Sequence, residues 1–315
     1  MLDRTVGPTD AAREQVRREL SGRRSDVSGT VFKLLLLLTL FLALAILIVL
    51  LVDVSQTAIP TIADRGGQIF GSGYSSLPAN AGIKTGLIGS LYLMVFVVVV
   101  ALPMGIGAAI YMEEYAKDTR VTRFINTNIR NLAGVPAIVY GILGLAVFVE
   151  LLQPVIGPGV EGRSLLAGGL TISLMVLPIV IITTQEALRA VPRSIREAGF
   201  GVGATRWEVI RSHVLPYAAP GVLTGSVLSM ARALGETAPL IMVGAVTGFL
   251  ATEGGLLASL QQHFTALPTL IFAYVKKPQP EFQDLASAAI LVLIVMIFLV
   301  NLTAILLRNR YERKW

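Results

Sequence analysis

Residues 34–52 read LLLLLTLFLALAILIVLLV, an apolar run in which Thr39 is the one polar side chain. A helix of this length is about long enough to cross the hydrocarbon core of a bilayer, which needs roughly 20 residues. The run begins after a polar arm, residues 1–33, and no small-residue cleavage site follows it, unlike a secretory signal peptide. We therefore expect a helix that stays in the membrane.

Five further apolar runs follow this one, with no soluble domain between them and no internal repeat. The predicted spans are residues 34–52, 85–112, 131–149, 164–184, 217–246 and 285–307. They predict an all-α, polytopic membrane protein with six transmembrane helices. Residues 34–307 would form the transmembrane domain, between the N-terminal arm 1–33 and a C-terminal tail 308–315.

The composition agrees with lipid surroundings and excludes several kinds of site. Hydrophobic residues make up 54% of the chain and charged residues 15%, with a mean hydropathy of +0.72, whereas charged residues average about a quarter of soluble proteins. The chain has no cysteine, and its two histidines, His213 and His263, lie far apart. We therefore expect no disulfide, no metal centre and no bound cofactor in this chain.

The placement of lysine and arginine orients the predicted spans. The N-terminal arm, the connections after the second and fourth spans and the C-terminal tail carry 20 of the 26 lysines and arginines; the other connections carry five, and Arg232 lies within a span. Because positive charge accumulates on the cytoplasmic side of membrane proteins, both termini should be cytoplasmic. This topology accounts for the positive net charge, so we expect a lipid bilayer and no nucleic acid as partner.

Arg232 and Glu236 lie well inside a predicted span, where each charge costs about 2.5–3.5 kcal/mol on insertion scales. Four residues apart on a helix, they share a face and can pair. One interpretation is a polar path through the membrane for an anionic substrate, with Glu236 restraining Arg232 or serving a gate. The other is an ion pair that fixes this helix to a neighbour. On the first interpretation the pathway residues are Ser229, Arg232, Glu236 and Thr237.

Glycine and proline interrupt three of the predicted spans. Gly235 and Pro239 flank Glu236, a Gly-Val-Pro sequence lies at 134–136, and a Leu-Pro sequence lies at 177–178. Broken helices are tolerated in membranes where they face protein or a water-filled cavity. Each break is therefore a candidate for lining a path, and a packing kink is the alternative.

The connection at residues 185–217 carries several signals for short helices. In chain order they are Pro192, a glycine cluster ending at Gly203, the pair Thr205 and Glu208, and Leu215-Pro216. The first suits the start of a helix, the glycines permit a tight turn, and the pair matches a capping box that begins a second helix. We expect Leu215-Pro216 to end that second helix before the fifth span.

Phe200 and Trp207 should be exposed on this connection, at the cytoplasmic face. An exposed aromatic side chain on a charged loop is typical of a residue that anchors a partner protein. The alternative is that Trp207 packs against the membrane interface, where tryptophan is common.

The same connection resembles the EAA signature of ABC importer permeases, the loop that docks on a cytoplasmic ATPase in that family. The resemblance lies in Glu197-Ala198-Gly199, in Gly203 and in Leu215-Pro216. The chain departs from the family pattern at His213, where an aliphatic residue is usual, and at Gly199, where a second alanine is usual. The resemblance implies a coupling loop, residues 185–217, with the contact residues Glu197, Ala198, Gly203, Trp207, Leu215 and Pro216.

Further motifs over residues 85–307 are similar to the PstA-type permease family of bacterial phosphate importers, which has the MetI-like (type I) ABC importer permease fold. They are GVPAIVYG at 134–141, Leu-Pro at 177–178, EALRAVP at 186–192 and, the most specific, RALGETAPL at 232–240. A methionine more often follows Gly-Glu-Thr in the sister PstC-type family. Ala137 stands where a serine is common, which removes one hydroxyl group from the expected path.

This resemblance implies partners and a location for the chain. It implies one half of a heterodimeric pore in the bacterial plasma (inner) membrane, with a PstC-type permease, two PstB-type ATPase subunits and a PstS-type phosphate-binding protein outside. Arg232 would meet phosphate, since a guanidinium offers planar paired donors to an oxyanion. ATP and Mg²⁺ would be used by the ATPase; this chain has no G-x-x-x-x-G-K-[ST] loop and is not expected to be an enzyme.

Three alternatives stand beside a phosphate permease. A permease for another oxyanion, such as sulfate, molybdate or phosphonate, belongs to the same class, and the sequence RALGETAP at 232–239 favours phosphate over it. An ATP-independent channel or carrier would have little need for so structured a cytoplasmic loop. An intramembrane enzyme has no support, because no His/Glu metal pair or Ser/His arrangement lies within the spans.

Overall fold

The computed structural model describes residues 13, 27–156, 161–245 and 259–311, and within them every regular element is a helix. Six helical stretches of this described part are long and apolar enough to cross a membrane. They are Ser28–Arg65, Lys84–Tyr115, Ala137–Pro154, Leu165–Arg189, Arg206–Gly235 and Pro280–Arg310. The all-α, six-span prediction is confirmed.

The chain divides into two units, residues 1–53 and residues 54–315, and helix α2 (Val27–Arg65) contributes to both. In the first unit, the side chains of α2 between residues 34 and 50 are exposed on every side. A helix that is apolar all round and buries none of its surface in protein is suited to lipid.

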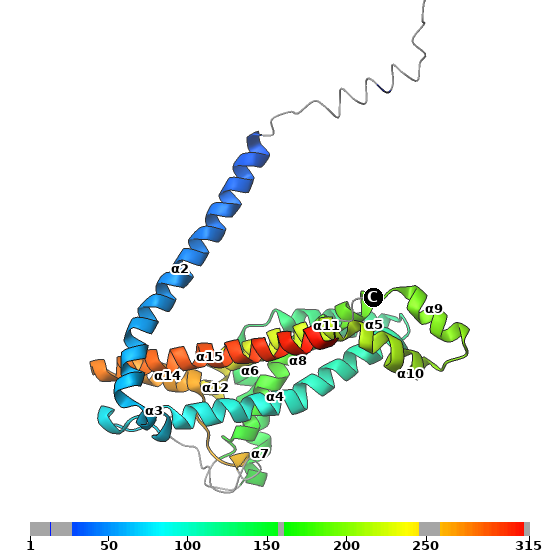
Figure 1. The fold of residues 1–315 in the computed structure, drawn as a ribbon. Coiled ribbons are helices and arrows are strands. Elements are labelled where there is room, and N and C mark those ends of the chain that lie inside the picture. The colour runs from blue at the N-terminus through cyan, green and yellow to red at the C-terminus, as the bar shows by residue number, and fades with distance from the viewer. Residues whose placement is uncertain (1–12, 14–26, 157–160, 246–258, 312–315) are drawn as a thin grey trace, which may run out of the picture. The chain divides into compact units, whose positions relative to one another are not determined.

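The second unit combines four long helices with shorter elements (Figure 1). The long helices are α4 (Lys84–Ile110), α8 (Leu165–Arg189), α11 (Leu215–Gly235) and α15 (Pro280–Tyr311). The shorter helices are α3 (Gly67–Gly71), α5 (Arg120–Ala133), α6 (Ala137–Gly144), α7 (Glu150–Ile156), α9 (Arg193–Gly201), α10 (Arg206–Val209), α12 (Ala238–Val243) and α14 (Leu267–Val275). The π turns η2 (Tyr111–Tyr115), η3 (Leu145–Val149) and η4 (Ile210–Val214) extend or join helices, and η1 (Pro78–Asn80) is a 3₁₀ turn.

Helix α8 is the central helix of the second unit and the most deeply buried of the six spans. It packs against α4 and α11, and α15 packs against α11. At two crossings a glycine is required: a side chain at Gly105 of α4 would clash with Val180 of α8, and one at Gly225 of α11 would clash with Thr183. These close approaches hold the three inner helices together.

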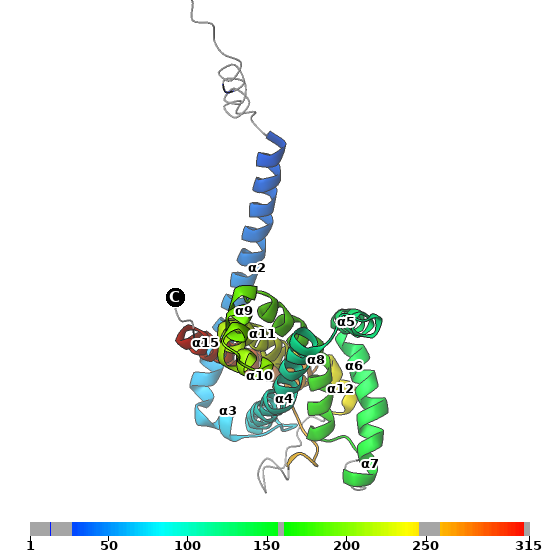
Figure 2. The ribbon, with the colours of Figure 1, turned by 90° about the vertical axis from the view of Figure 1, so that its right-hand side faces the viewer.

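The two ends of the second unit hold different elements (Figures 1 and 2). Helices α5, α9 and α10 lie at one end with the C-terminal end of α15, and we call it the α9 end. Helices α3 and α14 lie at the opposite end, which we call the α14 end. The connections that the charge count placed on one side of the membrane therefore lie at one end of this unit.

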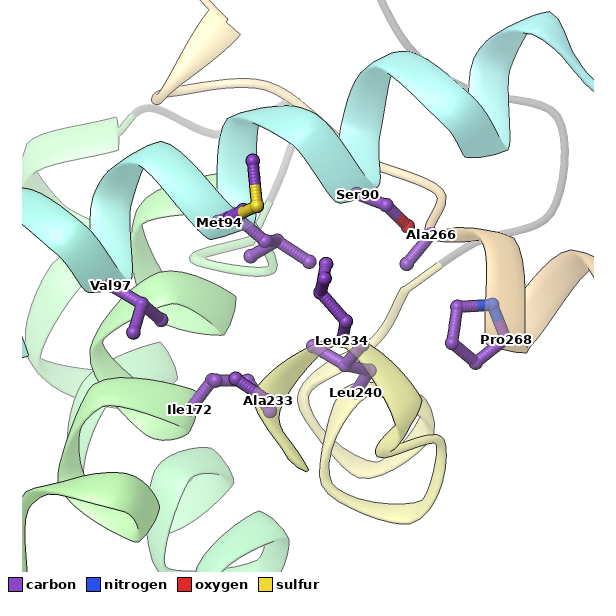
Figure 3. A pocket seen from close by; sticks show the side chains of 10 residues that line it. Ser90, Met94, Val97, Ile172, Ala233, Leu234, Leu240, Ala266 and Pro268 are labelled. Atoms are coloured by element: carbon purple, nitrogen blue, oxygen red, sulfur yellow. The ribbon is translucent and has the colours of Figure 1, made fainter. Parts of the chain in front are cut away.

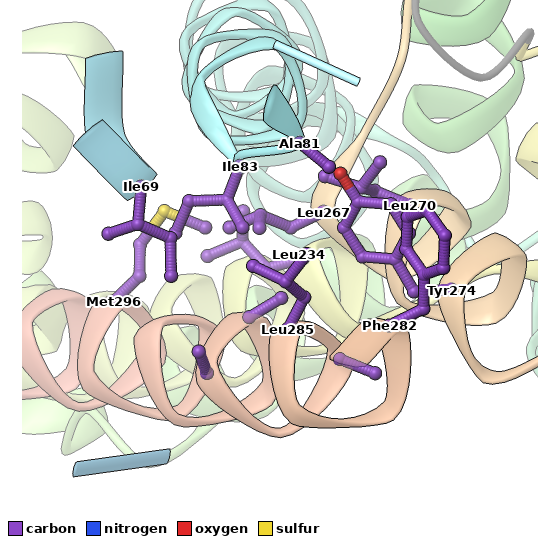
Figure 4. Close-up of a cluster of buried hydrophobic side chains, with 13 residues drawn as sticks. Ile69, Ala81, Ile83, Leu234, Leu267, Leu270, Tyr274, Phe282, Leu285 and Met296 are labelled. Atoms are coloured by element: carbon purple, nitrogen blue, oxygen red, sulfur yellow. The ribbon is translucent and has the colours of Figure 1, made fainter. Parts of the chain in front are cut away.

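Buried apolar side chains fill the α14 end (Figure 4). Tyr274 and Phe282 are fully buried, with ring centroids 5.4 Å apart. The Tyr274 hydroxyl donates a hydrogen bond to the carbonyl oxygen of Gly82 at 2.6 Å, which satisfies its polar atom inside the cluster. Ile69 and Ile83 pack in the same cluster. The α14-end cluster thus ties the segment around α3 to α14 and α15.

The third span differs from the predicted residues 131–149. Helix α5 ends at Ala133 and α6 begins at Ala137, with Gly134 at the C-cap of the first and Pro136 at the N-cap of the second. Proline disfavours helical backbone in the residue before it, so the Gly-Val-Pro sequence separates two helices. The stretch suited to the membrane is Ala137–Pro154, and residues 131–133 belong to the polar helix α5.

The fifth span differs from the predicted residues 217–246. Helix α11 ends at Gly235 and α12 begins after Thr237, so the chain breaks where glycine and proline predicted it; residue 246 lies outside the described residues. Pro178 lies inside an unbroken α8, so the sequence at 177–178 does not break its helix.

Candidate functional site

Arg232 and Glu236 form an ion pair at the end of α11. The Arg232 Nε atom lies 3.3 Å from Oε1 of Glu236, so the predicted pairing is confirmed. Helix α11 ends at Gly235, and Glu236 has an extended backbone that leaves the helix. A cation in the last turn of a helix is favoured by the free carbonyl groups there. The pair therefore lies at the end of a helix, at the break that Gly235 and Pro239 predicted.

Both side chains of this pair are accessible from outside the chain. The exposed fraction is 41% for the Arg232 side chain and 22% for Glu236. The Arg232 guanidinium is therefore not enclosed by the described residues of this chain.

Ser229 and Thr237 lie in different surroundings from the ion pair. Ser229 is fully buried within the chain, and its hydroxyl donates to the carbonyl oxygen of Gly225 at 2.9 Å. Thr237 is half-buried at the N-cap of α12 and makes no capping hydrogen bond with its side chain. The structure thus brings Thr237 and Glu236 together at the helix break, while Ser229 faces the interior; the role of all four residues in a path stays a prediction.

The two helix breaks lie against each other. A side chain at Gly141 of α6 would clash with Pro239 and Met242 of α12, so the two short helices approach closely. Tyr140 and Ala233 are buried in one apolar cluster. The sequence treated the break after α5 and the break after α11 as separate signals, and the structure joins them beside Arg232.

Two cavities in the described part of the chain do not suit an oxyanion. One of about 10 Å³ lies where α4, α8, α11 and α12 meet (Figure 3), which is room for about one water molecule. Its polar lining atom is the Ser90 hydroxyl, which accepts a hydrogen bond from the backbone N–H of Leu267 at 2.8 Å. A groove of about 490 Å³ between the end of α4 and α5 has Lys117 as its one charged lining residue. Arg232 lines neither of them.

The predicted coupling loop forms two short helices, α9 and α10. Gly203 lies between them with φ +82, a conformation that other residues rarely adopt. Thr205 then begins α10 with the expected capping box: its backbone N–H donates to Oε2 of Glu208 at 2.7 Å, and its hydroxyl accepts from the Glu208 N–H at 3.4 Å. The prediction of two helices with a capping box is confirmed.

Several apolar and acidic side chains of these helices are exposed. We define the docking surface as Glu197, Ala198, Phe200, Val202 and Trp207, all of which are exposed. Phe200 is 49% and Trp207 51% exposed, as predicted. Gly199 lies instead against Val209, where a Cβ atom would come within 2.7 Å of Val209 Cγ2. This contact explains the departure from the alanine of the family pattern.

Leu215-Pro216 does not end the second helix, contrary to the prediction. Helices α10 and α11 are joined by the π turn η4 into one helical stretch, Arg206–Gly235. Pro216 has no N–H, and its ring crowds the carbonyl group four residues earlier. A π turn, with one residue more than an α-helical turn, accommodates this without a break. Trp207 and Arg232 are therefore carried by the two ends of one helical stretch.

Two ion pairs at the α9 end were not predicted from the sequence. Glu113 pairs with Arg189 and Glu114 with Arg196, across more than 70 residues of chain. The acidic residues lie in the π turn η2, which follows α4. The only sequence signal was two adjacent glutamates at the end of a span, opposite an arginine-rich connection.

Comparisons with known proteins agree with this geometry. Residues 101–315 match the family model described as "Binding-protein-dependent transport system inner membrane component". The chain is 34% identical over 229 residues to the phosphate transport system permease protein PstA of Yersinia pestis, which covers 72% of each chain. It is 31% identical over 193 residues to the probable ABC transporter permease protein YqgI of Bacillus subtilis (strain 168), which covers 61% of this chain and 63% of that protein.

The fold recurs in a solved transporter. The crystal structure of the bacterial alginate ABC transporter, in complex with its pentasaccharide-bound periplasmic protein, aligns with a TM-score of 0.64. The alignment covers 90% of this chain and 96% of that chain at 16% identity, a level that shows the fold alone. With the family match, it confirms the MetI-like ABC importer permease fold.

Proposed function

Because this chain belongs to the family of binding-protein-dependent transport system inner membrane components, we propose that it is the permease subunit of an ATP-driven importer of inorganic phosphate. It is a multi-pass membrane subunit of an ABC importer. The similarity to a phosphate permease from Yersinia pestis supports phosphate as the substrate.

One observation carries the proposal: the helical stretch Arg206–Gly235 holds Trp207 of the docking surface in its first turn and Arg232 in its last. A movement of Trp207 relative to the bundle therefore acts on the helix that holds the arginine. Such a connection is what an importer needs, because the ATPase and the substrate lie on different sides of the same membrane span.

The chemistry at Arg232 suits an oxyanion. Its guanidinium is planar and offers paired N–H donors that match two oxygens of a phosphate. The contact to Glu236 is single, at 3.3 Å, so phosphate can replace the carboxylate with two bonds. When phosphate leaves, Glu236 takes up the charge again, and Arg232 is not left unpaired in the membrane.

Partners complete the path and supply the energy. Arg232 faces outward from this chain, so a PstC-type permease would provide the other half of the path. Two PstB-type ATPase subunits would bind the docking surface and use ATP with Mg²⁺, and a PstS-type protein would deliver phosphate. Both termini would lie in the cytoplasm, because the N-terminal arm, the connections after the second and fourth spans and the C-terminal tail carry 20 of the 26 lysines and arginines.

The test is phosphate uptake into proteoliposomes that contain both permeases and the ATPase, with ATP inside and the binding protein outside. We expect ATP-dependent uptake that excess sulfate does not inhibit. Equal transport of sulfate would show a different oxyanion importer, and uptake without ATP would show a channel or carrier.

Arg232→Ala tests the arginine within the same assay. A hydrogen-bonded charge contributes about 1.5–3 kcal/mol, so we expect phosphate uptake to fall about 10–100-fold while the ATPase still co-purifies. The matched control is Arg123→Ala, whose partner Asp118 and own side chain are largely exposed. Near-normal uptake by Arg232→Ala would leave this residue with a structural role only.

A further inference from the structure

Arg196 joins three elements at the α9 end. It lies in α9, one residue before the docking surface, and its Nη2 atom lies 2.7 Å from Oε1 of Glu114 in η2. The same guanidinium donates to the carbonyl oxygens of Leu188 at 2.9 Å and Val191 at 2.8 Å, where α8 ends. All three contacts use one planar group, so they fix its orientation as well as its position.

The acidic partner is buried and belongs to another span. Glu114 is 8% exposed, and it lies in the π turn that extends α4. The N–H of Ala116 donates to the carbonyl oxygen of Tyr111, so this turn holds one residue more than an α-helical turn. π turns inside helices are frequent at functional positions. A buried carboxylate also requires its cation, because an unpaired charge there is strongly unfavourable.

The apolar contacts around this pair do not fix the orientation of α9 relative to α4. Leu188, Val191 and Val209 form the centre of a small cluster in which Ile195 of α9 and Ile110 of α4 are partly buried. Apolar contact is non-directional, and it allows α9 to turn or slide against its neighbours. The Arg196–Glu114 bonds oppose such sliding, since both distance and angle matter for them.

Helix α4 leads from this pair to the neighbourhood of Arg232. Ser90, Met94 and Val97 of α4 line the small cavity together with Ala233 and Leu234 of α11 (Figure 3). Ala233 is the residue directly after Arg232. A displacement of α4 along its length therefore acts on the last turn of α11.

We propose that Arg196 is a positioning residue that connects α9 to α4 through Glu114, so that the docking surface moves two spans instead of one. Helix α10 continues directly into α11, and α9 acts on α4 by way of the ion pair. The two routes meet at Ala233. This inference rests on the proposed function, because the movement that it transmits comes from a partner ATPase.

The test uses a cysteine placed beside Arg232. The chain has no cysteine, and Gly235 has open space around its Cα atom, so Gly235→Cys introduces a single reactive thiol. In the reconstituted complex, the rate of maleimide labelling of this chain is compared with and without a non-hydrolysable ATP analogue. The measured quantity is the ratio of the two rates.

We expect the ratio in Arg196→Gln to fall at least about five-fold towards one, the lower range of typical coupling between sites. Arg196→Lys keeps the charge without the two-pronged geometry and should give an intermediate ratio. A merely structural role would change the amount of folded chain and of bound ATPase, and it would leave the ratio unchanged. Arg123→Gln, which breaks an exposed ion pair, is the control and should keep the ratio.

A second variant covers the case in which Arg196→Gln does not fold. Arg196→Met combined with Glu114→Leu replaces the buried pair by apolar groups, and proteins with such an exchange can fold well. In this variant too, the ratio of labelling rates should fall towards one. If either folded variant keeps the full ratio, the connection through Glu114 is wrong while the proposed function stands. If the parent Gly235→Cys complex shows no nucleotide dependence, the ATP-driven function and this inference both fail.

Discussion

The α14 end and the α9 end are held together by different forces. At the α14 end, large rings such as Tyr274 and Phe282 are completely buried. At the α9 end, the buried apolar residues are aliphatic and few, and ion pairs join the elements. Burial of apolar area contributes stability in proportion to that area. The comparison indicates that the α14 end contributes more of the apolar stability of the fold, while the α9 end relies more on directional ion pairs, as the proposed transmission of movement requires.

The largest effect is expected for Phe282→Ala. This residue is fully buried in the α14-end cluster, and such a truncation costs about 3–5 kcal/mol. Thermal unfolding in detergent should shift strongly downward, while the affinity of the remaining folded chain for the ATPase should not change. Phe298→Ala on the same helix is the control, because Phe298 is 63% exposed. A large loss of ATPase affinity in Phe282→Ala would contradict the separation of the two ends.

Trp207→Ala should have the opposite profile. Tryptophan anchors at protein interfaces typically contribute about 2 kcal/mol, so we expect the affinity for the ATPase to fall about 30-fold. Unfolding temperature should hardly move, since Trp207 is half-exposed. Leu77→Ala, on an exposed leucine outside the coupling loop, should keep the affinity. An unchanged affinity in Trp207→Ala would remove this residue from the docking surface.

Gly203→Ala sharpens the comparison within the α9 end. Its positive φ costs a residue with a side chain about 1–2 kcal/mol, which should misplace α10 and weaken ATPase binding roughly five-fold. Gly201→Ala is a matched control two residues earlier, at the end of α9, with negative φ and open space. Titration of the ATPase against each detergent-solubilised variant distinguishes them. Equal affinities for both variants would show that the turn does not position the surface.

The smallest effect is expected for Thr205→Ala, which removes the cap of α10. Loss of a helix cap increases local opening about five-fold, so the amide of Glu208 should exchange its hydrogen faster by about that factor. Amides in the α14-end cluster, such as Phe282, should keep their exchange rates. Faster exchange at both ends would mean that the second unit opens as a whole.

A feature of the fold or of the candidate site was predictable when the residues that determine it lie close together in the sequence. The six spans could be predicted because a membrane helix needs about 20 consecutive apolar residues. The Thr205–Glu208 cap could be predicted because its two residues are three positions apart. The prediction at Pro216 was wrong because a π turn differs from an α-helical turn by one added residue, and no pattern in the sequence marks that residue. The pairing of Glu114 with Arg196 depends on packing of α4 against α8, which residue spacing does not encode. The exposure of Arg232 likewise depends on which face of α11 its neighbours cover.

The π turn η4 also sets a rotational phase. Each residue of an α-helix turns the chain by about 100°, and η4 holds one residue more than an α-helical turn. That extra residue determines in which direction Trp207 points relative to Arg232. Deleting one uncharged residue between 210 and 214 would leave the net charge and both ends of the stretch intact, yet would turn Trp207 by about a quarter-turn relative to Arg232. On the proposed function, the direction of the ATPase contact relative to the phosphate contact thus depends on a single inserted amino acid.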